Sequence, residues 1–312
     1  MRKSLSSLLL LLPATAFAAP PECSHSQPRD LQLDLAGVTA VVFDVGPHDL
    51  KLEASPGAKG RLQGKACASD EKLLSQLTLS QRKSGEKLYV TLDRESVSGN
   101  LFFNNYAYLQ LAGSLPDNVT VQLDVGSGDA TVTGAPIVSA DVGSGDVTAR
   151  NIRGLVAAKV GSGDIQLEDI GSLQVISVGS GDLSAKRVKG AVKVGSINSG
   201  DFQMQGAKGD VEIESVGSGD ASVGDVSGNV RLGSVGSGDF ELKGATGNVE
   251  IGSIGSGDAH VSGISGKVDV QSVGSGGISA RDVRGDFSVL KKGSGSIDHD
   301  KVDGRVNVPS ED

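Results

Sequence analysis

A row of aspartates is the feature of this 312-residue sequence that could most directly do chemistry. Each aspartate ends a Gly-Ser-Gly-Asp phrase or its Asn-Ser-Gly-Asp variant, and the phrases recur every 17 to 19 residues. If the intervals align the carboxylates about 4.8 Å apart, neighbouring charges repel by about 1 kcal/mol in water. The row consists of Asp129, Asp146, Asp164, Asp182, Asp201, Asp220, Asp239 and Asp258.

Two kinds of partner could relieve this repulsion. Aspartate commonly accepts backbone N–H bonds within its own turn, and we favour this local chemistry. The alternative is a ladder of Ca²⁺ ions bridging the carboxylates, since calcium takes oxygen ligands. Basic residues at the equivalent place nine residues later argue against a regular metal row, so we expect no cofactor. That place holds Asp210, Asn229, Asn248, Lys267, Asp286 and Arg305.

An aromatic cluster is the second candidate site. Phe102, Phe103, Tyr106 and Tyr108 lie close together in a chain with only 3% aromatic residues. Aromatic faces stack on ligands, so the cluster is a candidate ligand platform. A thin repetitive fold also needs bulky side chains to plug its end, and we prefer this structural interpretation.

Catalysis is not indicated by the same residues. Enzymes that cleave polysaccharides bring unlike groups, such as paired carboxylates, together at one place. The aspartate row instead repeats one residue type, and each Gly-Ser-Gly recurs as a turn. We expect no enzyme, and a polysaccharide-active β-helix remains the third hypothesis.

The two cysteines predict one disulfide. Cys23 and Cys67 are the only cysteines, and a lone pair in an oxidising compartment most simply forms a bridge. The bridge would tie the start of the mature chain to the N-terminal module. The four histidines are scattered, which disfavours a redox or metal role for the pair.

The spacing of apolar residues shows which elements position the aspartates. Counted from each aspartate, apolar residues recur at offsets 1, 3, 6, 10, 12 and 15, and spacing by two is typical of strands. A repeat of this length predicts stacked coils that share one apolar interior. In the coil that starts at Asp220 these residues are Ala221, Val223, Val226, Val230, Leu232 and Val235.

Glycines divide each coil into two half-turns. Gly228 precedes the second half, just as Gly219 precedes the first. Glycine at these positions suits a backbone with positive φ or a close approach between stacked turns. We predict an all-β, parallel β-solenoid of about ten coils, roughly 50 Å long. The last copies degrade as a cap should, with Gly277 in place of aspartate and with Lys292 and His299 at inward positions.

The N-terminal residues predict export. Arg2 and Lys3, a short apolar core and Ala16-Phe17-Ala18 form a signal peptide over residues 1–18. Residues 19–114 follow as an irregular β cap, either degenerate coils or a separate module, then the solenoid at 115–308 and a polar tail at 309–312. We expect no transmembrane anchor, since the apolar run is too short to span a bilayer.

Net charge limits the partners. The chain carries a formal charge of −9, so it gains little from nucleic acid or anionic membranes. We expect instead a component of the cell envelope, either a glycan or a protein. The periplasm is the favoured location, with secretion or surface association as alternatives.

One phrase also resembles a known family. Leu115-Pro116-Asp117-Asn118-Val119-Thr120-Val121, leading into Val125-Gly126-Ser127-Gly128-Asp129-Ala130, resembles the bacterial β-strand-repeat proteins called "putative adhesins". These are related to head-domain autotransporter adhesins. The resemblance spans residues 40–308 and implies a right-handed β-helix-like fold and an envelope location. The leading hypothesis is thus a non-enzymatic, adhesin-like binding scaffold, ahead of a calcium-stabilised repeat protein.

Overall fold

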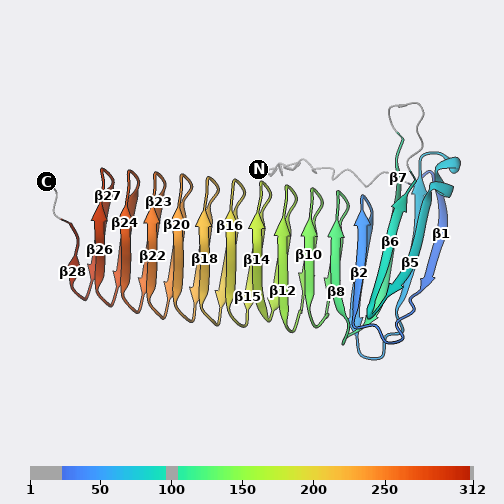
Figure 1. The fold of residues 1–312 in the computed structure, drawn as a ribbon, viewed down its shortest axis with the longest axis horizontal. Helices are drawn as coiled ribbons and strands as arrows, with labels where there is room; N and C mark the ends of the chain where they lie inside the picture. The colour runs from blue at the N-terminus through green and yellow to red at the C-terminus, as the bar shows by residue number, and fades with distance from the viewer. Residues whose placement is uncertain (1–22, 96–104, 310–312) are drawn as a thin grey trace, which may run out of the picture.

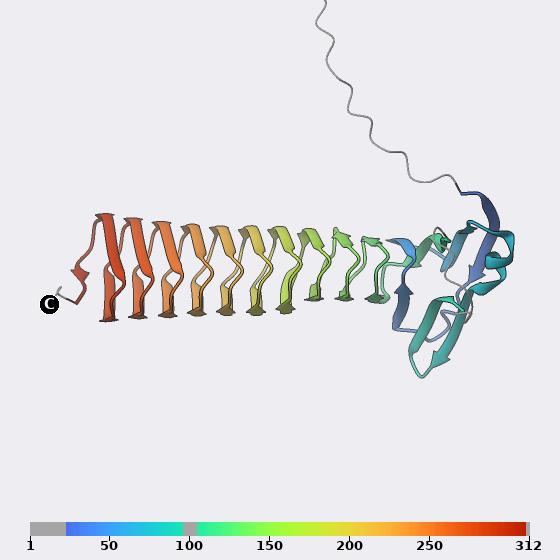
Figure 2. The same ribbon diagram turned by 90° about the horizontal axis from the view of Figure 1, so that it is seen from above.

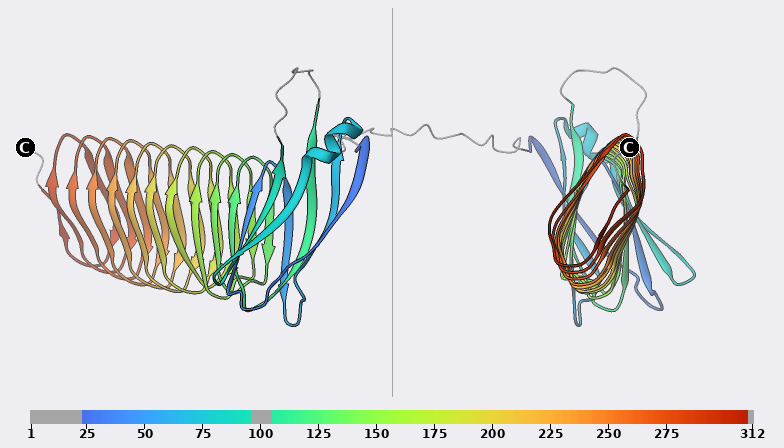
Figure 3. Two further views of the ribbon diagram at one scale, coloured as in Figure 1. Left: turned by 45° about the vertical axis from the view of Figure 1, so that its right-hand side comes forward. Right: turned by 90° about the vertical axis from the view of Figure 1, so that its left-hand side faces the viewer.

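The computed structural model describes residues 23–95 and 105–309 and forms a straight rod (Figure 1). Two 14-stranded sheets face each other along the rod. The chain passes from one sheet to the other at every half-turn, and the coils superpose as a flattened ring seen down the axis (Figure 3). The predicted all-β, parallel β-solenoid of about ten coils is confirmed.

We name the two sheets A and B. Sheet A contains, in spatial order, β1 (His25–Gln32), β4 (Arg61–Ala68), β7 (Ala107–Pro116), β3 (Asp49–Ser55), β9 (Ala130–Thr133), β11 (Val147–Arg150), β13 (Ile165–Ile170), β15 (Leu183–Val188), β17 (Phe202–Ala207), β19 (Ala221–Val226), β21 (Phe240–Ala245), β23 (Asp258–Ile264), β25 (Gly277–Val283) and β27 (Ser296–Val302). Sheet B contains, from the other end, β28 (Val306–Asn307), β26 (Phe287–Lys292), β24 (Val268–Val273), β22 (Val249–Ile254), β20 (Val230–Val235), β18 (Val211–Val216), β16 (Val192–Ile197), β14 (Ser172–Val178), β12 (Leu155–Val160), β10 (Val138–Val142), β8 (Thr120–Val125), β2 (Ala40–Gly46), β6 (Lys87–Arg94) and β5 (Leu77–Ser84). A short 3₁₀ helix, η1 (Glu71–Gln76), precedes β5.

The interior is one continuous aliphatic core. Val223, Leu242 and Val261 lie opposite one another in parallel register, and each is at most 1% exposed. Because identical offsets stack, each coil covers the apolar side chains of the coil before it. The inward positions predicted from the spacing are confirmed along the regular coils.

A bulge explains why the offsets run 1, 3, 6 instead of 1, 3, 5. The residue five places after each aspartate has positive φ, as at Asn151, Arg187 and Asp225. This extra outward residue moves the next inward side chain one place along the strand. A non-glycine residue in this conformation costs about 1 kcal/mol or more, so the stacked neighbours must hold the kink.

Sheet B acquires its own extra residue partway along the rod. The register shifts where β12 meets β14, so Ile176 has no partner opposite and lies 58% exposed. The three earlier sheet B strands β8, β10 and β12 pair without this shift. The lengthening of the repeat from 17 to 19 residues thus comes in part from this bulge.

The second glycine of each Gly-Ser-Gly phrase is required by close stacking. A Cβ on Gly238 would lie 1.9 Å from the carbonyl oxygen of Gly219, where no side chain fits. The N–H groups of Ser237 and Gly238 both donate to the carbonyl of Gly217, at 2.8 and 2.9 Å. Of the two explanations offered for these glycines, stacking therefore applies, since Gly238 is not among the glycines with positive φ.

The N-terminal end contains coils as well as a cap (Figure 2). Residues 40–55 form a coil, because β2 and β3 pair in parallel with β8 and β9. On its other side lie β6 and β7, also in parallel. Beyond them the pairing turns antiparallel, with β5 on β6, β4 on β7 and β1 on β4. The described part of this region, residues 23–95 and 105–114, thus combines coils with an antiparallel cap.

At the C-terminal end the inward side chains are less buried and the last strand is short. His299 lies opposite Ala280 at an inward position, yet it is exposed, with its ring 6.2 Å from Phe287. Lys292 is half-buried, and β28 has only two residues. The predicted signal peptide and most of the polar tail lie outside the described residues.

Candidate functional site

The aspartate row runs along one corner of the rod. The backbone N–H of Asp239 donates to Oδ1 of Asp220 at 2.9 Å, and the N–H of Asp258 donates to Asp239 in the same way at 2.9 Å. The same bond joins every neighbouring pair from Asp129 to Asp258. The donor therefore lies on the next coil, where the sequence analysis favoured one in the same turn. The row fastens successive coils together.

The row begins one coil earlier than the sequence suggests. Asp49 occupies the equivalent corner, and a backbone hydrogen bond from Asp129 favours its charged form. Burial and the neighbouring charge of Asp129 outweigh that bond and raise the pKa of the Asp49 carboxyl. The signal was present in Gly46-Pro47-His48-Asp49, which keeps the first glycine and the aspartate and is followed by Leu50 and Leu52.

His48 is the other functional group that the sequence analysis missed. It replaces the second glycine of the turn and is fully buried, and its Nδ1 accepts the N–H of Leu109 at 3.1 Å. Its Nε2 has no hydrogen-bond partner among the described residues. Burial, followed by the charge of Arg94, lowers the pKa of His48 to about 4. The imidazole is therefore neutral at neutral pH.

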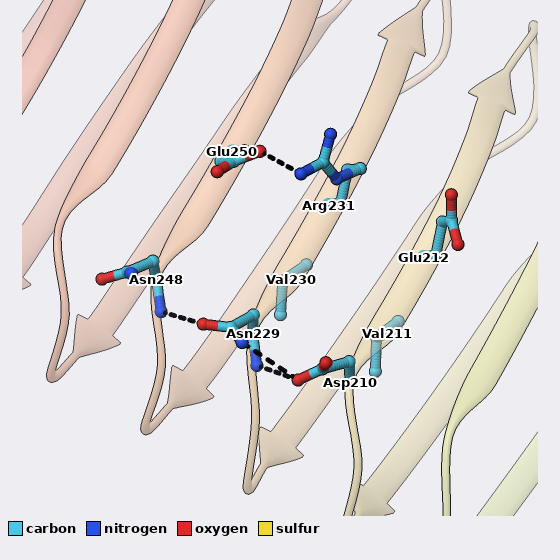
Figure 4. A pocket seen from close by; sticks show the side chains of 8 residues that line it. All are labelled: Asp210, Val211, Glu212, Asn229, Val230, Arg231, Asn248 and Glu250. Carbon is cyan, nitrogen blue, oxygen red and sulfur yellow. Dashed lines mark hydrogen bonds and ion pairs between the residues drawn. The ribbon is translucent and has the colours of Figure 1, made fainter.

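The opposite corner carries a second ladder, shown in Figure 4. The N–H of Asn229 donates to Asp210 at 2.7 Å, and the N–H of Asn248 donates to Asn229 at 2.9 Å. The same arrangement continues to Lys267 and joins Asp286 to Arg305. Asparagine and aspartate thus serve the same stacking role at this corner.

In a shallow groove beside that second ladder, charged side chains of the lining form ion pairs with each other or with neighbouring strands. Arg231 and Glu250 form an ion pair at 2.6 Å across neighbouring strands (Figure 4). Glu212, which also lines the groove, pairs with Lys193 at 3.4 Å. The polar groups here are largely occupied by one another, so this groove offers few free contacts to a ligand.

The aromatic cluster is only partly described. Phe102 and Phe103 lie outside the described residues. Tyr106 and Tyr108 have ring centroids 6.1 Å apart, and the Tyr106 hydroxyl lies 2.9 Å from Ser24 Oγ. Tyr108 lies on the face of β7 opposite the buried Leu109, so it does not plug the core. Leucines and Phe43 fill the interior here, while the role of the tyrosines as a ligand platform stays a prediction.

The predicted disulfide is confirmed. Cys23 and Cys67 are joined with a Cα–Cα distance of 5.6 Å, which ties the residues before β1 to the buried end of β4. Over residues 23–95 and 105–309, no group of three or more His, Cys, Asp or Glu side chains is placed to hold a metal ion. Helical structure in the same ranges is too short or too polar to cross a bilayer.

The fold and its corner ladders define a parallel β-solenoid protein whose coils are fastened by aspartate and asparagine. The chain belongs to the Toastrack DUF4097 family, whose model matches residues 38–208 and 206–312. The family membership predicted from the Leu-Pro and Gly-Ser-Gly-Asp phrase is thereby confirmed. No curated protein matches the chain.

Several solved structures are similar at low sequence identity. A putative adhesin from Bacteroides fragilis NCTC 9343 is 15% identical, with 89% of this chain and 98% of that one covered and a TM-score of 0.34. A putative adhesin from Parabacteroides merdae ATCC 43184 is 14% identical, with 92% and 97% covered and a TM-score of 0.34. A putative lipid binding protein from Parabacteroides distasonis ATCC 8503 is 15% identical, with 92% and 98% covered and a TM-score of 0.35.

Proposed function

We propose that this chain is a non-catalytic, exported scaffold that binds a component of the cell envelope in an adhesin-like manner. The observation that carries the proposal is the parallel stacking of successive coils from β8 to β27, whose register shifts where β12 meets β14. Each coil presents the same outward positions as the last, about 4.8 Å further along the rod. A stiff surface of this kind suits a partner that is itself extended and repetitive.

Export to the periplasm is part of the proposal. The signal-peptide pattern of residues 1–18 supports it, and so does the bond between Cys23 and Cys67, because disulfides persist in oxidising compartments. The row of aspartates supports a structural role for these side chains, since each accepts a backbone N–H from the next coil.

Fractionation of the native host tests the location. We expect the protein in the periplasmic or outer fractions, and a variant lacking residues 2–18 in the cytoplasm. Recovery of the unaltered chain from the cytoplasm would refute export.

Retention of the purified protein on isolated cell envelopes tests the binding role. We expect the folded rod to sediment with envelopes and the urea-unfolded chain, diluted just before mixing, to stay in solution. Equal recovery of both in the supernatant would contradict a binding role.

A further inference from the structure

The outer face of sheet A carries a column of neutral polar side chains. Two residues after each aspartate the side chain points outward, and strand register places these side chains opposite one another on successive coils. Hydroxyl and amide groups both donate and accept hydrogen bonds. We name this set the neutral column: Thr131, Thr148, Gln166, Ser184, Gln203 and Ser222.

Three shallow hollows follow one another along the neutral column. The first and second share Ser184 and Lys186, and the second and third share Gln203 and Ser222. Together they extend from Thr148 on β11 to His260 on β23. We call this continuous depression the sheet A groove.

The two outer faces differ in what their polar groups do. From β16 to β22 the matching column of sheet B is charged and pairs with itself, through Lys193 with Glu212 and Arg231 with Glu250. From β8 to β14 it is uncharged and is interrupted by Ala157, so it offers no continuous row of hydrogen-bonding side chains. In the part of the chain that the structure describes, the side chains of Thr148, Gln166, Ser184 and Gln203 form no hydrogen bond to another protein group. Their bonding capacity faces solvent over successive coils.

The spacing of the neutral column favours a sugar chain over a peptide. Neighbouring coils present equivalent groups about 4.8 Å apart. An extended peptide advances about 3.3 Å per residue, so its residues do not coincide with successive coils. An extended chain of β-1,4-linked pyranoses advances by nearly one coil per sugar. Its hydroxyl groups can therefore meet a donor or acceptor on every coil.

Charge along the sheet A groove selects among sugar chains. Asp201, Asp220, Asp239 and Glu241 line its third hollow, and these carboxylates repel polyanions. At the other end Arg150 is paired with Glu168 at 3.2 Å, which leaves Lys186 in the first two hollows as the cation that opposes these carboxylates.

We propose that the sheet A groove binds a neutral, extended polysaccharide that lies along the rod axis. This inference rests on the proposed envelope-binding function and names the ligand class and the site. Hydroxyls of the sugar chain bond to the neutral column, and the acidic edge rejects acidic polysaccharides.

Sedimentation of the purified mature protein with insoluble cellulose and chitin tests the proposal. We expect retention that resists added salt, because the contacts are between neutral groups. The variant Gln166→Ala/Gln203→Ala should bind at least about tenfold more weakly, the loss of about 1.4 kcal/mol. The control Gln122→Ala/Gln174→Ala removes two outward glutamines from sheet B and should bind like the unaltered protein.

Each other outcome overturns the inference. Failure to bind either polysaccharide, or binding that Gln166→Ala/Gln203→Ala leaves unchanged, refutes the site. Preference for polygalacturonate or for poly-L-proline refutes the ligand class. If envelope retention persists while cellulose and chitin fail, this inference falls and the proposed function stands.

Discussion

Residues 120–302 and residues 25–116 build the same two sheets but hold their strands by different contacts. The regular coils are held together by closely stacked glycine turns and by ladders of side-chain hydrogen bonds, which repeat from coil to coil. The N-terminal region uses a disulfide, a buried imidazole and antiparallel strands instead. Repetition therefore makes stability a sum of similar interfaces, whereas the N-terminal region depends on single contacts that can be removed one at a time.

Crowding a glycine turn should produce the largest effect. Gly238→Ala places a methyl group 1.9 Å from the Gly219 carbonyl, so the two coils must separate. We expect a loss of about 4 kcal/mol or more in the free energy of unfolding, measured by urea denaturation followed by circular dichroism. Ser237→Ala alters an exposed residue of the same turn and should change it by less than about 0.5 kcal/mol. Similar midpoints for both variants would show that the coils do not depend on close stacking.

Removing the disulfide should act mainly on the N-terminal region. Cys23→Ser releases a link between residues 44 apart and should cost about 3 kcal/mol. Limited proteolysis should then cut within residues 23–95 first, while the regular coils stay intact. Uniform digestion along the rod would mean that both regions unfold as one unit.

Acid should destabilise the N-terminal region through His48. The pKa of His48 is about 4 in the folded chain and 6.5 as a free group, so the unfolded chain binds more protons between these values. Stability present above about pH 6.5 is therefore lost as the pH falls, by up to about 3 kcal/mol. In His48→Asn the amide oxygen can accept the Leu109 N–H without titrating, and the pH dependence should flatten in this window. Arg94 and Asp93, whose charges act on His48, remain in both proteins, and identical pH profiles would exclude His48 as the cause.

The smallest effect is expected where the two regions meet. Asp44 and Asp124 lie directly opposite in parallel register, and burial together with the charge of Asp124 raises the pKa of Asp44. Asp124→Asn should stabilise the fold by about 0.5 kcal/mol, since like charges in this position repel. On the next strand Asp141 pairs with Lys159 at 2.9 Å, so Asp141→Asn should not stabilise. Because Asp141 also lies opposite Asp124, a gain from both variants would contradict the assignment of the effect to the Asp44 contact.

Repetition made the regular coils readable from the sequence. The shared offset of Val223, Leu242 and Val261 predicted which side chains face the core, because each inward side chain packs against the coils on both sides of it. The coil at residues 40–55 could not be told from a separate module, because Pro47 and His48 replace the serine and glycine of its turn. The partner of each aspartate was also out of reach, since a donor on the next coil depends on stacking and not on local spacing.

The coil at residues 40–55 is sandwiched between strands that come later in the chain. One side of β3 is covered by β7 and the other by β9, so the chain closes a long loop before the regular coils can follow. Such closure costs entropy that short-range pairing does not. Until residues 130–133 pair with β3, one edge of this coil has no partner strand. Every later coil can then stack on a coil that is already formed.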